Sequence, residues 1–235
     1  MEIPLPAAGG FSVGLRCVGE RVPAHAFCTD EERWITRVSD HYYTNRPSAA
    51  HDEQQISFVL RGCELRFYTD AGVFSRDRID FGSVLLIENM KVAPHARVLD
   101  VGCGYGPIGL TAARLASQGR VTMIDVNERA VQLARRNAEG NGIRNVDIRV
   151  SDVYSDVQGE TFDVILTNPP IRAGKEIVHR IFTEGHELLE EGGELWVVIQ
   201  KKQGAPSALK KLQETYREVE EVDRSKGYFI FRAVK

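Results

Sequence analysis

A strand that runs directly into a cluster of glycines constrains the fold of this chain more than any other feature. Residues 98–109 read VLDVGCGYGPIG, with glycines at positions 102, 104, 106 and 109. Glycine adopts left-handed backbone conformations and lets a ligand approach the main chain closely. When such a turn joins a strand of an open parallel sheet to a helix, it lies in the ligand crevice at the carboxyl edge of the sheet. We therefore expect a ligand site at this turn.

Strands and helices alternate regularly through the rest of the chain. The sequence predicts strands at 97–101, 121–125, 146–150, 162–167 and 194–199, and helices at 108–117, 127–137, 175–190 and 206–216. The glycines at 192 and 193 are expected to end the third of these helices. The segments REVEEV and GYFIFRAV predict two further strands near the end of the chain. This alternation indicates an α/β fold, with a mostly parallel sheet covered by helices on both faces.

The region before this alternation divides into two parts. Residues 1–38 are rich in Pro, Gly and Ala and have no sustained period, so we interpret them as an N-terminal extension. The folded domain is expected over residues 39–235, with a β-hairpin at 56–69 around Gly62 and a Rossmann-like core over 80–235. A helix is expected at 83–90, between the hairpin and the first strand of the core.

Charge and cysteine content exclude several classes of protein. The net charge is −3 and the pI about 6.1, so no global positive field attracts nucleic acid, and any such contact requires a local basic patch. The four cysteines contain no CxxC pair and the six histidines no ligand spacing, which predicts neither a metal site nor a disulfide framework. No apolar run is long enough for a membrane span and no secretory signal is visible. We expect a cytoplasmic protein.

Two cofactors compete for the glycine turn. Gly104, Gly106 and Gly109 match the GxGxxG pattern, and Asp125 ends the next strand, where an acid would bind the ribose of NAD. However, Asp100 comes directly before the glycines, and a carboxylate there repels a pyrophosphate. S-adenosyl-L-methionine has no phosphate and carries an α-amino cation and a sulfonium. The acid beside the turn therefore favours S-adenosyl-L-methionine.

The same interpretation gives roles to the acids that follow the next two strands. Asp125 would accept hydrogen bonds from both ribose hydroxyls. Asp152 would accept from the exocyclic amine of adenine, with the Val153 N–H as a second contact. For Asp152 an ordinary turn or N-cap aspartate remains the alternative.

The tripeptide Asn168-Pro169-Pro170 follows the strand at 162–167 and so lies at the same sheet edge. The prolines fix φ and restrict the residues before them, which makes the loop rigid. Because proline has no backbone N–H, the loop offers carbonyl acceptors and lacks donors at these two positions. Their carbonyls and the Asn168 side-chain oxygen can accept two hydrogen bonds from an –NH2 group. Such a loop would orient a planar amine toward a methyl donor, and positioning of this kind is a large part of catalysis. A simple strand-ending turn is the alternative interpretation.

Several motifs together carry a resemblance to a known family. The segments VLDVGCGYGPIG, MIDVN, RNAEGNGIRNV, SDVY and TNPPI resemble class I S-adenosylmethionine-dependent methyltransferases. The segments TDAGVFSRDRIDFGSVLLIE, NPPIRAGKEIVHRIF and WVVIQKKQGAPSALKKL resemble, more specifically, the small-subunit ribosomal RNA guanine-N2 methyltransferases in their short single-domain branch. The resemblance covers roughly residues 40–235. It implies a seven-stranded, mostly parallel Rossmann-like sheet with an antiparallel last strand and a small N-terminal hairpin.

The resemblance also implies a set of site residues. The segment around Phe74, Asp80, Phe81 and Gly82 would close over the cofactor. The cofactor would be held by Asp80, Asp100, Gly102, Cys103, Gly104, Gly106, Asp125, Val126, Asp152, Val153 and Asn168. The target amine would be held by Asn168, Pro169 and Pro170, which are the implied catalytic residues.

Two departures from the family pattern concern the substrate. The better-known ribosomal RNA enzymes have two methyltransferase-like domains in tandem, and this chain has room for one. The position after NPP is often aromatic, to stack on a flipped base, but here it is Ile171. Stacking would then fall to Phe74, Tyr42 or Tyr43, for each of which ordinary packing is an equal alternative.

Basic residues follow the NPP motif. Arg172, Lys175 and Arg180, together with Lys201 and Lys202 after the next strand, predict a local patch for RNA phosphates, with a solvated helix face as the alternative.

The sequence thus predicts an N-methyltransferase that uses S-adenosyl-L-methionine and acts on an exocyclic amine of an RNA base, guanine N2 of ribosomal RNA, with substrate contacts from Phe74, Ile171, Arg172 and Lys175. Methylation of a protein glutamine amide or of a DNA adenine amine, and a non-catalytic RNA-binding module of the same fold, remain as alternatives. An NAD enzyme is the least favoured interpretation.

Overall fold

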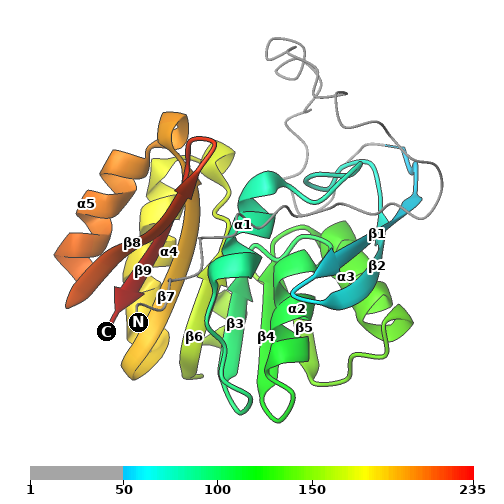
Figure 1. The fold of residues 1–235 in the computed structure, drawn as a ribbon, viewed down its shortest axis with the longest axis horizontal. Coiled ribbons are helices and arrows are strands. Elements are labelled where there is room, and N and C mark those ends of the chain that lie inside the picture. The colour runs from blue at the N-terminus through cyan, green and yellow to red at the C-terminus, as the bar shows by residue number, and fades with distance from the viewer. Residues whose placement is uncertain (1–49) are drawn as a thin grey trace, which may run out of the picture.

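The computed structural model describes residues 50–235, so the predicted extension at 1–38 and the tyrosines at 42 and 43 lie outside the described residues. Within that part, the core is a seven-stranded sheet with the order β5-β4-β3-β6-β7-β9-β8 (Figure 1). The strands are β3 (Arg97–Val101), β4 (Arg120–Asp125), β5 (Val146–Val150), β6 (Phe162–Thr167), β7 (Leu189–Gln200), β8 (Glu218–Ser225) and β9 (Tyr228–Val234). The strands β3 to β7 pair in parallel, and β9 runs antiparallel to both of its neighbours. The predicted sheet is confirmed.

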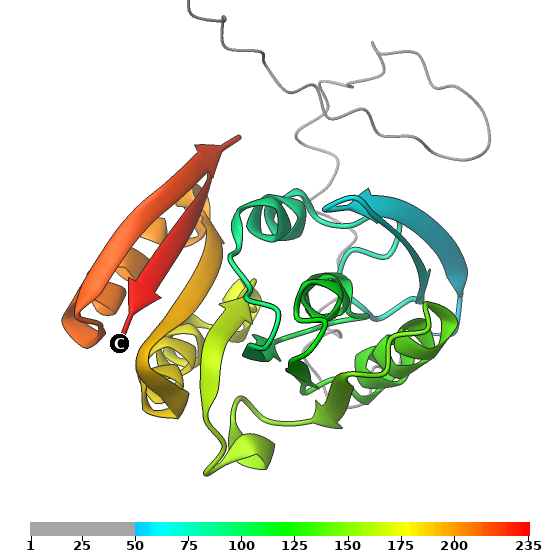
Figure 2. The ribbon, with the colours of Figure 1, turned by 60° about the horizontal axis from the view of Figure 1, so that its bottom comes forward.

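Among residues 50–235, five helices cover the two faces of this sheet (Figures 1 and 2). They are α1 (Phe81–Asn89), α2 (Pro107–Leu115), α3 (Glu128–Gly140), α4 (Lys175–Leu188) and α5 (Ala205–Thr215). Alternate strand residues face opposite sides, so Val98 packs in the core under α1 to α3, whereas its neighbour Leu99 packs in the core under α4 and α5. Both faces of a parallel sheet are thereby buried, as its near-continuous apolar strands require.

The boundary between α4 and β7 differs from the prediction. The helix ends at Leu188, and the strand begins at Leu189, before the two glycines that were expected to end the helix. Leu189 pairs with Phe162, and the register then shifts before Val164 pairs with Glu194. The glycines therefore lie inside an irregular first half of β7, where Gly192 takes a φ of 77°.

Three short 3-10 helices, η2 (Ser155–Val157), η3 (Ile171–Ala173) and η4 (Lys201–Gln203), follow β5, β6 and β7 at the carboxyl edge. Over residues 50–235, no helix combines the length and the apolar character that a membrane span needs. The same residues contain no group of three or more His, Cys, Asp or Glu side chains arranged to hold a metal ion.

A separate antiparallel hairpin, β1 (Gln54–Leu60) and β2 (Cys63–Thr69), packs beside α3 (Figure 1). Asn137 of α3 and Asn141, the C-cap of that helix, form with β2 the hydrogen bonds that a neighbouring strand would form. Asn137 accepts from the Tyr68 amide at 2.6 Å and donates to the Tyr68 carbonyl at 3.0 Å. Asn141 makes the same pair of hydrogen bonds with Arg66, at 3.0 and 2.7 Å. Asn137 also donates to the carbonyl of Tyr105 in the glycine turn, at 2.9 Å, so one side chain joins hairpin, helix and turn.

These two asparagines allow a matched test of how the hairpin is held. Asn137→Asp keeps the shape but cannot donate to its two carbonyl partners, and the site is 1% exposed, so we expect a loss of about 1–3 kcal/mol in the free energy of unfolding. Asn141→Asp likewise cannot donate to its two carbonyl partners, those of Arg66 and Asn137, but this side chain is only partly buried, so water can replace the bonds and the loss should be roughly 1 kcal/mol or less. Urea unfolding measures both, and equal losses would contradict this account.

Candidate active site

A cavity of about 390 Å³ opens at the carboxyl edge of the sheet, around the ends of β3, β4 and β6. Its size is in the range of small-molecule and cofactor sites. The predicted site residues that line it are Phe74, Asp80, Gly102, Cys103, Gly104, Asp125, Val126, Asp152, Val153, Asn168, Pro169, Pro170, Ile171 and Arg172. The structure therefore brings most of the predicted site into one cavity. Asp100, Gly106 and Lys175 do not line it, and neither do Phe81 and Gly82 of the segment expected to close over the cofactor.

The glycine turn presents its main chain to the cavity. Gly102 and Gly104 have φ of 74° and 57°, conformations that favour glycine. A Cβ atom on Gly104 would meet nothing within 4 Å, so its backbone borders open space. Gly106 has another role, because a Cβ there would lie 3.1 Å from Leu110 and from Met123. It is a packing glycine at the start of α2.

Asp125 ends β4 and ties the turn to the next helix. Its Oδ2 accepts from the Gly104 amide at 2.8 Å, and its Oδ1 accepts from the Asn127 amide at 2.9 Å. Burial raises the pKa of Asp125, and these amide hydrogen bonds oppose the shift. A carboxylate offers about four lone-pair positions, so acceptor capacity remains for the hydroxyls of a ribose. Both the open glycine backbone and this partly buried acid fit S-adenosyl-L-methionine.

Asp100 lies one layer behind the cavity wall. It is fully buried, and neither carboxylate oxygen forms a hydrogen bond within the described residues. Burial raises its pKa to about 7; the Gly109 amide opposes this shift without a well-formed hydrogen bond, and the charge of Asp125 adds to it. A Cβ on Gly109 would lie 2.8 Å from Asp100 Oδ2 and 2.7 Å from Met123, so this glycine lets α2 pack against the acid.

The raised pKa of Asp100 predicts a pH dependence of stability. Between its unfolded pKa near 4 and its folded pKa of about 7, the folded protein holds a proton that the unfolded chain releases. Stability should therefore fall as the pH rises from 4 to 7, by on the order of a few kcal/mol. Asp100→Asn, which stays neutral, should flatten this slope in urea titrations between pH 5 and 8. An unchanged slope in the variant would refute the assignment.

Asn168, Pro169 and Pro170 line the cavity next to the glycine turn, because β6 pairs with β3 and a Cβ on Gly102 would lie 4.0 Å from Pro170. The Asn168 Nδ2 donates to Asp80 Oδ2 at 3.1 Å and to Ser83 Oγ at 3.0 Å. The Pro170 carbonyl accepts from the Ala173 amide at 2.9 Å and so starts η3. No hydrogen bond reaches the Pro169 carbonyl from any described residue, which leaves that oxygen and the Asn168 oxygen as the acceptors of this loop. Both are suited to a donor of the substrate.

Asp152 and Val153 lie beyond β5 at the third side of the cavity. Val153 has a φ of 50°, which is an outlier for a β-branched residue and costs on the order of 1–3 kcal/mol. The Ser151 hydroxyl holds this strained backbone by donating to the Val153 carbonyl at 2.9 Å. Asp152 keeps its side chain exposed. The strain lies where the sequence expects the adenine to bind.

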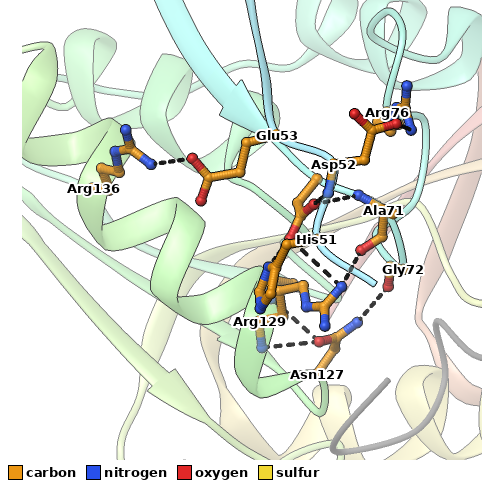
Figure 3. Close-up of polar contacts among 11 residues, drawn as sticks. His51, Asp52, Glu53, Ala71, Gly72, Arg76, Asn127, Arg129 and Arg136 are labelled. Carbon is orange, nitrogen blue, oxygen red and sulfur yellow. Dashed lines mark hydrogen bonds and ion pairs between the residues drawn. The ribbon is translucent and has the colours of Figure 1, made fainter. Parts of the chain in front are cut away.

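The loop from residue 70 to residue 79 covers the cavity from the hairpin side, and α3 anchors it (Figure 3). Asn127 donates to the Gly72 carbonyl at 2.9 Å and Arg129 to the Ala71 carbonyl at 2.6 Å. The buried Asp70 accepts from the Asp52 amide at 2.6 Å and contacts His51 Nδ1 at 2.5 Å. Burial raises the pKa of Asp70, but these hydrogen bonds, the Ala71 amide and the Arg129 charge outweigh burial and lower it. The loop is thus fixed beside the predicted ribose site.

Sequence reasoning missed several residues that line the cavity, among them Ser75, Ser83, Tyr105, Asn127, Ser151 and Gln203. Asn127 is the N-cap of α3, where its side-chain oxygen accepts from the Arg129 and Ala130 amides. Ser83 carries no motif of its own. Its contact with Asn168 joins positions 85 apart in the sequence, and no local pattern predicts such a pair.

The fold and the cavity together define a class of protein. A seven-stranded sheet with one antiparallel strand, a glycine turn after β3, an acid at the end of β4 and an NPP loop after β6 are the features of a class I methyltransferase. The family is shown by comparison with known sequences: the chain belongs to the Methyltransferase small domain family, whose profile matches residues 64–232. It is an S-adenosylmethionine-dependent methyltransferase.

Three relatives illustrate the range of the family. The chain is 53% identical over 200 residues to "Uncharacterized protein YbxB" of Bacillus subtilis, covering 84% of this chain and all of that protein. It is 34% identical over 176 residues to ribosomal RNA small subunit methyltransferase C of Erwinia tasmaniensis, covering 73% of this chain and 50% of that protein. It is 30% identical over 199 residues to ribosomal RNA large subunit methyltransferase G of Aeromonas hydrophila, covering 82% and 51%. The chain therefore spans about half the length of these two ribosomal RNA enzymes.

Two solved structures have the same fold as this chain. The T. thermophilus 16S rRNA N2 G1207 methyltransferase, in complex with AdoMet and guanosine, superposes with a TM-score of 0.71 and 25% identity. The match covers 80% of this chain and 52% of that one. The ribosomal protein L11 methylase of Lactobacillus delbrueckii also matches, with a TM-score of 0.55 and 25% identity, over 64% of this chain and 75% of that one. The same fold thus serves different acceptors in these two proteins.

Proposed function

We propose that the chain methylates an exocyclic amine of an RNA base, guanine N2 of ribosomal RNA. The observation that carries the proposal is the Asn168 side chain, whose –NH2 is bound to Asp80 and Ser83, so that its oxygen is the group offered to a substrate. Two acceptors, this oxygen and the Pro169 carbonyl, match the two N–H donors of an amine. Support for guanine comes from the T. thermophilus relative, which was solved with guanosine.

The mechanism we propose depends on position. S-adenosyl-L-methionine supplies an electrophilic methyl group. Gly102 and Gly104 would bind its methionine part, Asp125 its ribose, and Asp152 with Val153 its adenine. The Asn168 oxygen and the Pro169 carbonyl would hold both amine hydrogens, which keeps the nitrogen lone pair aimed at the methyl group. No strong base is required before attack, because the amine can lose its proton after the transfer.

The surface around the NPP loop fits an RNA substrate. Arg172 and Lys175 are exposed beside the loop, and Lys201 and Lys202 are exposed after the next strand. Such residues contact phosphates and position nucleic acid without reading its sequence. Ile171 is partly buried and offers a small apolar surface, whereas Phe74 is 40% exposed and lines the cavity. We assign the stacking contact with the base to Phe74.

Labelled S-adenosyl-L-methionine tests this proposal directly. The protein should transfer label to total RNA from a strain that lacks the gene, and mass spectrometry should locate the product as N2-methylguanosine in ribosomal RNA. The Asn168→Ala variant serves as the control for transfer by a contaminating enzyme. Label in a protein or a small molecule, with none in RNA, would overturn the proposed substrate.

A further inference from the structure

The substrate side of the cavity depends on which way the Asn168 side-chain amide is turned. Its nitrogen donates to Asp80 Oδ2 at 3.1 Å and to Ser83 Oγ at 3.0 Å. These two bonds use both hydrogens of the –NH2 group. Because the amide is planar, its oxygen then points away from α1. The first turn of α1 therefore determines what Asn168 presents to a substrate.

Because Asp80 carries a carboxylate, only one orientation of the Asn168 side-chain amide is favourable. The two ends of an asparagine amide have nearly the same shape, so only the surrounding hydrogen bonds distinguish them. A serine hydroxyl can donate or accept, and Ser83 alone would tolerate either orientation. A carboxylate only accepts, so Asp80 pairs with the –NH2 end and repels the oxygen end. Asp80 therefore determines the orientation of the Asn168 amide, and Ser83 accepts the second hydrogen of its –NH2 group.

Asp80 is itself held by groups from α1 and from β9. It caps α1, where its Oδ2 accepts from the Ser83 amide at 3.2 Å, and its Oδ1 accepts from the Tyr228 hydroxyl at 3.5 Å. A Cβ on Gly82 would lie 2.8 Å from the Tyr228 ring and 2.9 Å from Asp80, so the three groups pack closely. Burial and the charge of Asp80 raise the pKa of Tyr228 to about 12, so its hydroxyl keeps the proton that it donates.

We infer that Asp80 and Ser83 are positioning residues, which hold the Asn168 oxygen toward the substrate and thereby select a substrate group that donates hydrogen bonds. The inference rests on the proposed role of Asn168. It gives Asp80 a different part from the cofactor contact that the family resemblance implies. The role assigned here follows from the hydrogen bonds that the Asp80 carboxylate accepts from α1, β9 and the NPP loop.

Two substitutions separate this role from a general loss of structure. Asp80→Asn keeps the shape and the helix cap, because Asn caps as well as Asp, but it supplies an –NH2 that lets the Asn168 amide flip. We expect kcat to fall about tenfold to a hundredfold, the value of a hydrogen bond to a charged group. Ser83→Ala should lower kcat about threefold to tenfold. The Kd for S-adenosyl-L-methionine and the KM for RNA should change little.

The control is a second Asp–Asn pair, which joins the last residue of α1, Asn89, to Asp223 of β8. Asp223 Oδ2 accepts from Asn89 Nδ2 at 2.9 Å, at the far end of α1 and outside the cavity. Asp223→Asn makes the same chemical change and should leave kcat unaltered. If it lowered kcat as much as Asp80→Asn does, the effect would belong to the helix and the inference would fail.

A double-mutant cycle shows whether Asp80 acts through Asn168. In the Asn168→Ala background, Asp80→Asn should cause no further loss in single-turnover rate. Losses that multiply would overturn the inference. A fall in cofactor affinity instead of kcat would also overturn it and assign Asp80 to the cofactor.

A measurement without RNA keeps the inference separate from the proposed substrate. The side-chain ¹⁵N resonance of Asn168, assigned by its absence in Asn168→Ala, should shift in Asp80→Asn and in Ser83→Ala but not in Asp223→Asn. An unchanged resonance would refute the inference. The expected shifts, together with no transfer to RNA, would support the positioning and refute the substrate.

Discussion

Replacing Asn168 by alanine is expected to lower the rate of methyl transfer by at least about a hundredfold while the Kd for S-adenosyl-L-methionine stays within about twofold. Loss of one preorganised polar group at a reacting centre commonly costs a factor of roughly 10² to 10³ in kcat. The substitution removes one of the two acceptors that we assign to the amine and leaves the Pro169 carbonyl. The Asn168 side chain binds Asp80 and Ser83 and forms no hydrogen bond with Asp125 or the glycine turn among the described residues, so those cofactor groups stay in place. Single-turnover kinetics and calorimetry measure the two quantities separately.

Asn145→Ala is the matched control for losing a structural asparagine. Asn145 donates to the Ala113 and Ala116 carbonyls at 3.0 and 2.8 Å, next to the start of β5 and away from the cavity. Its loss should lower the free energy of unfolding but not kcat of the folded enzyme. If Asn168→Ala retained full turnover, the amine-binding role of the NPP loop would be wrong.

The second large effect concerns the cofactor. We expect Asp125→Ala to weaken binding of S-adenosyl-L-methionine by about tenfold to a hundredfold, because the acid would accept from the ribose and also holds the Gly104 amide at 2.8 Å. The thermal shift that saturating cofactor gives to the wild-type protein should shrink accordingly. Calorimetry measures the Kd directly.

Asp147→Ala provides the comparison. Asp147 lies on β5 and forms an ion pair with Arg149 at 2.6 Å, outside the cavity. Cofactor affinity should be unchanged in that variant. Equal affinity in the Asp125 and Asp147 variants would remove Asp125 from the cofactor site.

The sequence predicted the parts of this molecule that local pattern controls. The strands at 97–101, 146–150 and 162–167 have the expected bounds, since short apolar runs between turn residues determine them. The glycine turn, Asp125 and the NPP loop were also placed at one edge, because parallel strands bring their carboxyl ends together. These features need no knowledge of distant contacts.

Other parts could not be predicted in this way. Gly106 and Gly109 match a ligand pattern in the sequence, but their neighbours in the fold are Met123, Leu110 and Asp100. Close packing favours glycine at both positions, and at Gly106 so does a φ of 104°. The orientation of Asn168 depends on Asp80, 88 residues away, and that of Asp80 on Tyr228, 148 residues away. Such pairs are defined by tertiary packing and leave no period or spacing to recognise.

The position of β9 has a consequence for the order of folding. It is the last strand in the chain, yet it lies between β7 and β8. β8 has no other strand to pair with in the sheet, so it cannot join the sheet before β9 does. The same docking event brings Tyr228 to Asp80. The pairing of β9 with β7 therefore does two things at once: it adds the last two strands to the sheet, and it supplies the hydroxyl that binds the carboxylate holding Asn168.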